Sequence, residues 1–476
     1  MKLSTHLPTW FCLSAWLMGS VGCRSVGPDY HGPPQGAVVN APDARGPFVS
    51  SSDPAFSNAH APSQWWRLYD SPQLDELVGA ALVANTDLRM ARANLERSAA
   101  LLREARAARQ PTAEVNFDPS FQQLSPESYL HSGMLSPTGL YDTGVSVSYE
   151  LDLFGRLKRG VEAAQADDEA VRAAYDLTKV TVAAETARAY ADFCNAGEEL
   201  EVTRRSLQLQ VQSTETTRRL VEAGRTSSLD LTRSSGQVAQ VRANIPALEA
   251  QRMNALYRLA ALTGKPPAEY PRSVESCATA PRLQQPLPIG DATALLRRRP
   301  DVREAEREVA AATARVGVAT ADLYPRVTVG ASAGSTGVIE DLLTTPTNRF
   351  GIGLAIQWQA NVSLARARIS QAGAVEKLVL ARFDGVVLTA LRDTESALTT
   401  YNRDLQRDSD LATVQARATE AERQARWLYV GGKMDFLALL DSQRTLAAAD
   451  DAVAGSHARL ATDQVAIFLS LGGGWE

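Results

Sequence analysis

Histidine and cysteine are the residues of this chain most often used for metal chemistry, and their spacing does not support it. The histidines stand singly along the chain, at His6, His31, His60, His131 and His457. A zinc site would need several ligands close together, and no C-x-x-C pair occurs. The sequences G-x-x-x-x-G-K-[ST] and H-E-x-x-H are also absent. We therefore expect neither a metalloenzyme nor a P-loop enzyme, and no metal.

One stretch matches a hydrolase motif in its letters alone. Residues 330–334 read G-A-S-A-G, the form of a G-x-S-x-G nucleophile elbow. Such an elbow needs a strand, a sharp turn and a helix, followed by a suitable histidine. Here the motif lies within alternating strand residues, and the only later histidine is His457 in a helical stretch. We expect no catalytic residue and no enzyme activity.

Cys23 is a candidate for a covalent lipid. Residues 10–21 are apolar, which suits the core of a signal peptide and is too short to span a bilayer. Cys23 follows small residues, so residues 1–22 resemble the signal peptide of a bacterial lipoprotein, although Ser20 stands where such signals usually carry Leu. We expect a lipid on Cys23 and no other cofactor. An ordinary signal peptide is the alternative.

Two further cysteines remain beyond the signal. Cys194 lies in a long helical run and Cys277 in a proline-rich linker. An oxidising periplasm would permit a disulfide between them. Two buried free thiols are the default expectation, because free cysteine is usually buried as a small apolar residue.

Composition describes a folded, helix-rich chain. The 476 residues carry a net charge of −5, with 45% hydrophobic and 22% charged side chains. These proportions argue against bulk disorder. The acidic balance gives no basic surface for nucleic acid, so no nucleic-acid partner is expected. Alanine mixed with Arg, Glu, Gln and Leu is typical of long helices.

The elements that must position any site occur twice in the same order. Helical patterns cover 73–109, 160–222 and 229–262 in the first half, with Pro246 predicting a kink or break. They return at 291–323, 364–427 and 434–471 in the second half. The stretch 160–222 alone would span about 95 Å as a helix. An offset near 210 residues indicates a tandem duplication.

Each half also carries two strand-like stretches between its helices. They cover 117–121 and 143–153, then 325–335 and 350–358, and the clearest of them alternate apolar and polar residues. Their length and alternation suit outer-membrane strands, but eight strands are the usual minimum for a closed barrel. We therefore expect several protomers to share one barrel, with long helices beneath it.

Several motifs in order resemble the TolC/OprM family of outer-membrane efflux proteins, in particular its lipoprotein (NodT-like) branch. They cover nearly the whole mature chain, namely Val26-Gly27-Pro28-Asp29-Tyr30, Trp65-Trp66, Tyr149–Arg156 (YELDLFGR), Arg298–Arg303 (RRPDVR), Tyr324-Pro325-Arg326, Leu439–Arg444 (LLDSQR) and Leu471–Trp475 (LGGGW). One junction departs from the pattern. Residues 359–364 read Q-A-N-V-S-L where the family usually has Pro-Leu-Phe-Asp-Gly-Gly-Arg.

The resemblance implies a mixed α/β membrane protein in the cell outer membrane. A homotrimer would form a twelve-stranded β-barrel, four strands per protomer, continued by a coiled-coil tunnel of twelve helices in the periplasm. It would be the passive exit duct of a tripartite efflux pump for drugs or other small solutes. Its partners would be a periplasmic adaptor and an inner-membrane pump of the resistance–nodulation–division (RND) class. The domains would be a signal peptide (1–22), a lipidated tether and equatorial segment (23–72), a first repeat (73–264), an equatorial linker (265–290) and a second repeat (291–476).

The resemblance also implies a gate at the periplasmic helix tips. Leu437 and Asp441 would line it as an apolar ring and a carboxylate ring, and Asp230 would hold it closed with Tyr429 and Lys433. Such rings block or select ions, whereas acids near turns are more often solvated or capping groups. Adaptor contacts would come from Gly224, Arg225, Thr226, Gly432, Met434 and Phe436. For Met434 and Phe436, packing within the tip is the favoured alternative.

Two other functions stay open. The partner could be a type I secretion system that exports proteins. A lipid-anchored coiled-coil scaffold would explain the helices but not the four amphipathic strands.

Overall fold

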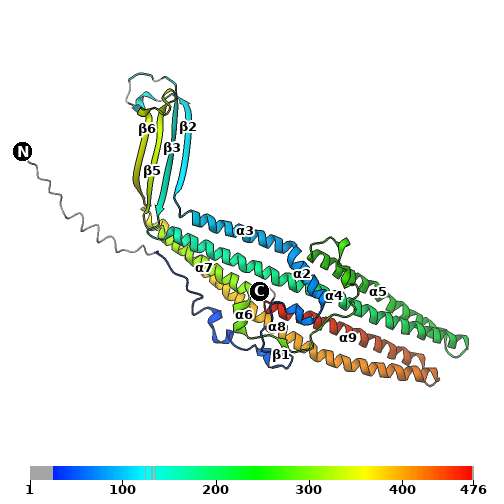
Figure 1. Cartoon of the computed structure of the whole chain (residues 1–476). Helices are drawn as coiled ribbons and strands as arrows, with labels where there is room; N and C mark the ends of the chain where they lie inside the picture. Colours follow the sequence, from blue (N-terminus) through cyan, green and yellow to red (C-terminus); the bar gives the residue numbers. More distant parts are fainter. Residues whose placement is uncertain (1–24, 124, 130–131, 135, 474–476) are drawn as a thin grey trace, which may run out of the picture. The chain divides into compact units, whose positions relative to one another are not determined.

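A computed structural model of the chain describes residues 25–123, 125–129, 132–134 and 136–473 (Figure 1). The predicted signal peptide, Cys23, and Gly474 and Trp475 of the last motif lie outside these residues. The chain divides into two compact units, and each combines segments from both sequence halves. The first unit comprises residues 1–32, 96–170 and 306–382, and the second comprises 33–95, 171–305 and 383–476.

The helices and strands follow one another in two similar series along the chain. In chain order they are β1 (Phe56–Ser57), α2 (Pro72–Ala84), α3 (Thr86–Ala107), β2 (Thr112–Gln122), β3 (Thr138–Leu151), α4 (Arg156–Glu222), α5 (Ser228–Leu262), β4 (Leu287–Pro288), α6 (Ala292–Arg298), α7 (Pro300–Ala321), β5 (Arg326–Val338), β6 (Asn348–Gln357), α8 (Val362–Val430) and α9 (Phe436–Ser470). Short 3₁₀ turns connect several of them. Among the described residues, no helix is long and apolar enough to cross a bilayer.

The first unit contains a four-stranded antiparallel sheet in the order β2-β3-β5-β6 (Figure 1). Leu140 pairs with Val338 and Leu151 with Val327 where the two halves of the chain meet. All of β6 is exposed, and its apolar side chains alternate along one face, with Phe350 92% exposed. The strand lengths differ from expectation, because β2 begins at Thr112 instead of Phe117 and β3 ends at Leu151.

The G-A-S-A-G stretch lies inside β5. Ser332 pairs with Ser146 on β3 and Gly351 on β6, so the motif forms an extended strand and no elbow. A side chain at Gly334 would collide with the Thr143 carbonyl oxygen. The glycine therefore permits close pairing of β5 with β3.

Two of the predicted helices are each divided into two. The stretch 73–109 breaks at Asn85, whose side-chain oxygen accepts hydrogen bonds from the Asp87 and Leu88 amides at 2.8 and 3.2 Å and so caps α3. The stretch 291–323 breaks at Arg299, which precedes Pro300 and is disfavoured from helical backbone. The predicted break at Pro246 does not occur, since α5 is one helix over 228–262.

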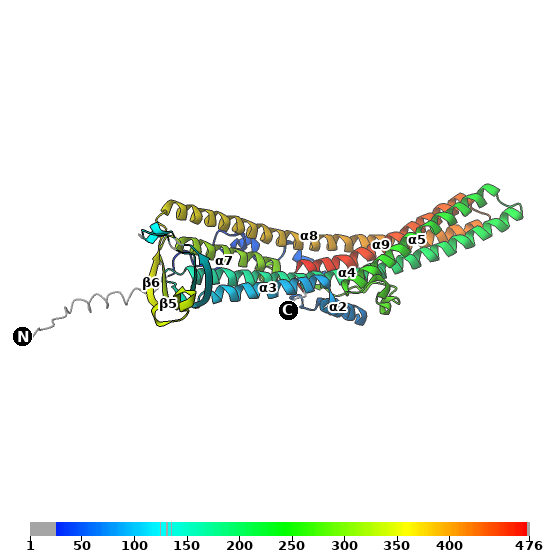
Figure 2. The same ribbon diagram turned by 90° about the horizontal axis from the view of Figure 1, so that it is seen from above.

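In the second unit, α5 lies along α4 and α9 along α8, and both pairs end in a turn (Figure 2). Their core holds large buried side chains that include Trp65, Phe193, Leu259 and Phe468. Trp65 stacks on Phe468 with ring centroids 4.8 Å apart.

A disulfide joins Cys194 to Cys277, with Cα atoms 5.3 Å apart. The default expectation of two free thiols is therefore wrong. The geometric reason is that the linker after α5 folds back along α4. The Cys277 carbonyl oxygen lies 3.3 Å from the position that a Cβ at Gly197 would take, so this approach favours glycine.

Gln464 on α9 also holds the linker. Its side-chain oxygen accepts a hydrogen bond from the Leu283 amide at 3.0 Å, and its amide nitrogen donates to the Leu283 carbonyl oxygen at 3.0 Å and to the Tyr401 hydroxyl at 2.9 Å. The residue is almost fully buried, so these bonds satisfy polar groups that would otherwise destabilise the core. No local sequence pattern predicted that this glutamine would bind the linker.

Candidate functional site

The turns at the two helix tips have the same backbone geometry. After α4, Gly224 has φ +71° and the Arg225 amide donates to the Leu220 carbonyl at 2.8 Å. After α8, Gly432 has φ +67° and the Lys433 amide donates to the Leu428 carbonyl at 2.8 Å. A left-handed glycine with this bond terminates a helix and satisfies its last carbonyls. The repeat therefore builds two equivalent tips.

A small apolar cluster packs the tips. Its buried members are Ala425, Tyr429, Phe436, Leu439 and Leu440, with Leu220 and Met434 partly buried against them. Phe436 is only 3% exposed and its ring centroid lies 5.8 Å from that of Tyr429. Phe436 thus packs the tip, in agreement with the second interpretation of this residue and not with a surface contact.

The glycine turns stay exposed around this cluster. Gly224, Arg225 and Gly432 are exposed, and Thr226 is half-buried. These positions keep the predicted adaptor surface accessible within one chain.

Leu437 and Asp441 lie four residues apart on α9 and so share one face of the helix. Leu437 is 52% exposed, and Asp441 is exposed as well. An exposed leucine beside a buried cluster leaves apolar surface that its own chain does not cover. The pair is therefore available to face other copies or a pore.

Asp230 has its hydrogen-bond partners in its own turn. Its carboxylate accepts from the Thr226 and Ser227 hydroxyls at 2.7 and 3.0 Å, and it forms a capping box with Ser227. Burial raises the pKa of Asp230, but the hydrogen bonds from Thr226 and Ser227 and the charge of Arg233 outweigh it, so the pKa is lowered overall. The carboxylate is therefore ionised at neutral pH.

Tyr429 and Lys433 have different surroundings from Asp230. The buried Tyr429 hydroxyl has no hydrogen-bond partner in the part of the chain that the structure describes. The Lys433 ammonium lies 5.8 Å from the Trp427 ring centroid. The fold of one chain does not bring these two side chains to Asp230, so the three-residue bridle remains a prediction.

Two neighbouring residues on α9 do connect the helix pairs. Gln443 donates to the Ser213 hydroxyl on α4 at 3.1 Å, and Arg444 donates to the Gln237 side-chain oxygen on α5 at 2.8 Å. Sequence reasoning missed this role, although both residues belong to the LLDSQR motif. They tie α9 to the other helix pair near the tip.

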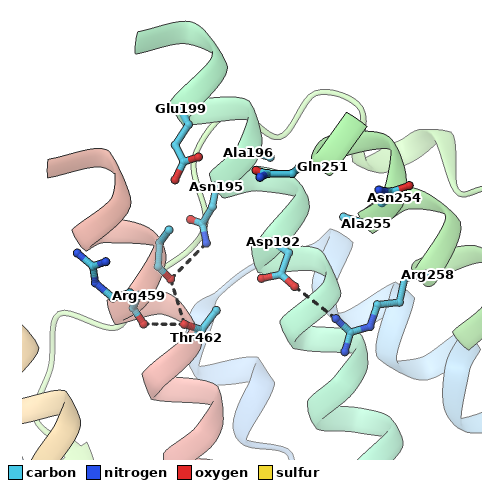
Figure 3. Close-up of a pocket in the computed structure, with 11 residues that line it drawn as sticks. Asp192, Asn195, Ala196, Glu199, Gln251, Asn254, Ala255, Arg258, Arg459 and Thr462 are labelled. Atoms are coloured by element: carbon cyan, nitrogen blue, oxygen red, sulfur yellow. Dashed lines mark hydrogen bonds and ion pairs between the residues drawn. The ribbon is translucent and has the colours of Figure 1, made fainter. Parts of the chain in front are cut away.

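A cavity of about 450 Å³ lies between α4, α5 and α9 (Figure 3). Arg258 from α5 reaches Asp192 on α4 at 3.4 Å, and Asn195 donates to the Ala458 carbonyl on α9 at 3.4 Å. Burial raises the pKa of both Asp192 and Glu199. Acidic, amide and guanidinium groups all line this cavity, so it favours neither an anionic nor a cationic ligand.

One carboxylate on α9 titrates near neutrality. Burial and the charge of Asp404 on α8 raise the pKa of Asp463 from 3.8 to about 7, against the opposing charges of Arg459 and Arg188. The folded chain therefore holds this proton more tightly than the unfolded chain does. Ionisation of Asp463 weakens the fold progressively as the pH rises from about 4 to above 7.

Asp463→Asn is expected to stabilise the protein by about 2 kcal/mol at pH 8 and to have almost no effect near pH 4, because only the ionised side chain is costly. This figure is about half of what the pKa shift alone would give, since solvent screens a half-buried group. Thermal unfolding of both proteins across this pH range is the measurement. Asp410→Asn, an exposed carboxylate on α8, is the control and should shift the melting temperature little at either pH. A gain that is the same at pH 4 and pH 8 would contradict the assignment.

The segment after the predicted lipid site is fixed to the first unit. Arg159 on α4 is only 4% exposed in its side chain and donates to the Val26 and Gly27 carbonyls at 3.2 and 3.3 Å and to Asp29 at 2.6 Å. Tyr30 donates to Glu306 at 3.1 Å. The Asp29–Arg159 pair lowers the pKa of Asp29. Val26–Tyr30 is therefore a strap along the helices and not a free tether.

Gly317→Ala on α7 should release this strap. A Cβ there would lie 2.9 Å from the Arg159 side chain, which cannot move away without breaking its hydrogen bonds to the strap. Gly27 (φ +87°) also lies directly against the Gly317 backbone. We expect the free energy of unfolding to fall by about 1–3 kcal/mol. Thermal unfolding measures this loss, and faster protease cleavage near residue 30 would show that the strap has been released. Gly160→Ala on α4 has free space around it and should instead be neutral or slightly stabilising. Equal behaviour of the two variants would refute the strap.

Comparisons with known proteins agree along nearly the whole chain. Residues 77–265 and 292–473 match the family model described as outer membrane efflux protein. The toluene efflux pump outer membrane protein TtgF of Pseudomonas putida is 31% identical over 96% of this chain and 95% of its own length. The probable outer membrane lipoprotein SilC of Salmonella typhimurium is 30% identical over 95% and 96%. The solved outer-membrane channel OprN superposes with a TM-score of 0.88 at 34% identity, covering 94% of this chain and 99% of OprN.

Proposed function

Because the chain belongs to the outer membrane efflux protein family, we infer that it is the outer-membrane channel of an efflux pump and acts as the passive exit duct. It is an outer-membrane protein with the mixed α/β fold of these channels. Within that function we propose a trimeric assembly, a gate at the helix tips, a lipid anchor and two pump partners.

The observation that carries the assembly is the pair of open sheet edges. The sheet has four strands, and β2 and β6 are its edge strands. In lipid every backbone polar group must be paired, so an open edge is not tolerated. Four strands cannot close alone, whereas three copies supply twelve and let β6 of one protomer pair with β2 of the next.

The tip residues supply the closed gate in this proposal. Leu437 would face its symmetry copies as an apolar constriction, and Asp441 would add a ring of carboxylates one turn away. An apolar constriction excludes ions by dewetting, and a carboxylate ring favours cations. Asp230, Tyr429 and Lys433 would hold this state across protomers, since they are not joined within one.

Asp441→Ala is expected to lower the preference of the pore for cations several-fold, because it removes one negative charge per protomer at the constriction. The reversal potential of single channels in a potassium chloride gradient measures the preference. Glu420→Ala is the charge-matched control, as Glu420 is paired with Arg423 on its own helix. The assignment fails if both variants shift the potential equally.

The partners follow from the helix tips and from the predicted lipid site. The exposed turns at Gly224, Arg225 and Gly432 offer small polar contacts for a periplasmic adaptor, and an RND transporter would load the duct from the inner membrane. Met434 adds a partly buried apolar contact at most. A lipid on Cys23 would act as a second membrane attachment just before the strap. No catalytic step is proposed, because Ser332 lies in a strand.

The particle mass in mild detergent tests the assembly. The full chain is extracted from outer membranes and its mass is measured with bound detergent subtracted. Three copies of the 51.2 kDa chain, less the signal peptide, are expected. A stable folded monomer would overturn the shared barrel and leave a lipid-anchored scaffold as the better account.

A further inference from the structure

The atypical junction between β6 and α8 borders a polar pocket of about 440 Å³ in the first unit. We propose that this pocket binds the phosphate of a phospholipid headgroup at the periplasmic face of the outer membrane. The proposal rests on the membrane position of the sheet given above and is independent of the gate.

The pocket lies where the apolar face of β6 ends. Phe350, Ile352, Leu354 and Ile356 occupy alternate positions, and alternate residues of a strand share one face. Trp358 continues this series one residue beyond the strand and lines the pocket at 59% exposure. The lipid-facing row therefore leads directly to the pocket.

Two aromatic side chains mark this level as the membrane interface. The Trp358 indole donates to the Leu323 carbonyl at 3.1 Å, which fixes its ring beside the pocket. Tyr324 lines the same pocket and stacks on Phe154 with centroids 4.4 Å apart. Trp and Tyr gather at the headgroup level of membranes, where one side of the ring is apolar and the other is wet.

The charge of the pocket favours an anion. Arg326 and Arg368 line it, and Asp322 is the single carboxylate among its lining residues. Asp322 accepts from Arg326 at 2.9 Å and lies 3.8 Å from Arg368. About half of each arginine side chain is exposed, so donors remain available. Guanidinium groups bind phosphate oxygens through paired donors.

The first repeat does not build the same surface. There Glu150 pairs with Arg156 at 2.7 Å, and Asp152 accepts from the Leu157 and Lys158 amides, so carboxylates occupy the junction. At the second junction Gln357 and Gln359 line the pocket instead. No acidic residue occurs between Asp341 and Glu376 in the sequence. At this departure from the family motif, Arg326 and Arg368 share the one carboxylate of Asp322, whereas Arg156 in the first repeat has Glu150 to itself. The two arginines therefore keep more of their positive charge.

Lipid binding to the intact detergent-extracted trimer tests the proposal. Native mass spectrometry would compare phosphatidylglycerol and phosphatidylethanolamine with diacylglycerol of the same chains, which lacks the phosphate. We expect the two phospholipids to bind about tenfold more tightly than diacylglycerol, and Arg368→Gln to weaken phosphatidylglycerol binding about five- to tenfold. Arg366→Gln on the same helix removes the same charge outside the pocket and should change binding less than twofold.

A second variant acts in the opposite direction and so cannot be explained by misfolding. Asp322→Asn removes the carboxylate that competes for both arginines and should strengthen phosphatidylglycerol binding about threefold. The proposal would be overturned if diacylglycerol bound as tightly as the two phospholipids, or if Arg368→Gln and Arg366→Gln weakened binding equally. It would also be overturned if Asp322→Asn bound phosphatidylglycerol more weakly than the unmodified protein. Complete displacement by millimolar inorganic phosphate would assign the pocket to the free ion instead. The mass of the particle reports separately whether the trimer itself persists.

Discussion

Replacing Gln443 and Arg444 together by alanine is expected to raise the ratio of open to closed channels about a thousandfold. These side chains connect α9 to Ser213 on α4 and to Gln237 on α5. If opening moves α8 and α9 away from α4 and α5, both hydrogen bonds exist only in the closed state. A variant that lacks them would then favour the open state.

The size of the effect comes from threefold repetition. The partly buried Gln443 bond contributes about 1 kcal/mol and the exposed Arg444 bond about 0.5 kcal/mol. Three protomers that open together would lose about 4.5 kcal/mol, and about 1.4 kcal/mol is a factor of ten. A single hydrogen bond in a single chain would have little effect.

Single-channel recording in planar bilayers measures this ratio. Thr445→Ala is the matched control, because its hydroxyl donates to the Asp441 carbonyl of its own helix and so does not connect the helix pairs. It should leave the open fraction unchanged. An unchanged open fraction in the double variant would mean that the tips are held by other contacts, with the Asp230 bridle as the next candidate.

Loss of the Cys194–Cys277 disulfide is expected to destabilise the protein by about 3–5 kcal/mol. The bond closes a loop with a sequence separation of 83 residues, and a loop of this length loses considerable chain entropy when it is cross-linked in the unfolded state. The double variant Cys194→Ala/Cys277→Ala should melt about 3–5 °C lower, because the unfolding entropy of a chain of this length makes each kcal/mol worth about 1 °C in melting temperature.

A reductant separates the bond from the packing of the side chains. Cys194 is fully buried, so its replacement also removes apolar contacts. Reductant should lower the melting temperature of the unmodified protein towards that of the double variant and leave the double variant unchanged. A melting temperature that is insensitive to reductant in both proteins would show that the bond contributes no stability.

Much of the fold could be predicted from local pattern. Alternation identified the strands around Val145 and Ile352, and proline-free runs identified α4 and α8, because these signals depend only on residue period. Element ends were less accurate. The breaks at Asn85 and Arg299 fell inside continuous helical patterns, where one capping side chain or one following proline decides the boundary.

Only part of the candidate site could be predicted from the sequence. Gly224 and Gly432 indicated the tip turns in the sequence. Leu437 and Asp441 were predicted as gate residues only because the chain resembles the family. The burial of Phe436 agrees with the packing alternative given for it above, whereas the bonds of Gln443, Arg444 and Gln464 had no signal in the sequence. Each depends on a partner more than 60 residues away or on packing between helices, which no local pattern records.

The class of this protein follows from its residues read in order: two repeats of amphipathic strands and long helices, too few strands to close alone, and a set of motifs shared with one family. The repeats and strands are properties of residue period and length, and the motifs are a resemblance in local sequence, so all of them exist before the chain folds. Which side chains meet became known only from the folded chain. Folding joined Cys194 to Cys277, fixed Val26–Tyr30 with Arg159, and brought Arg326 and Arg368 together beside Trp358. Contacts between distant segments depend on how helices and strands pack, and packing is set by the whole chain at once.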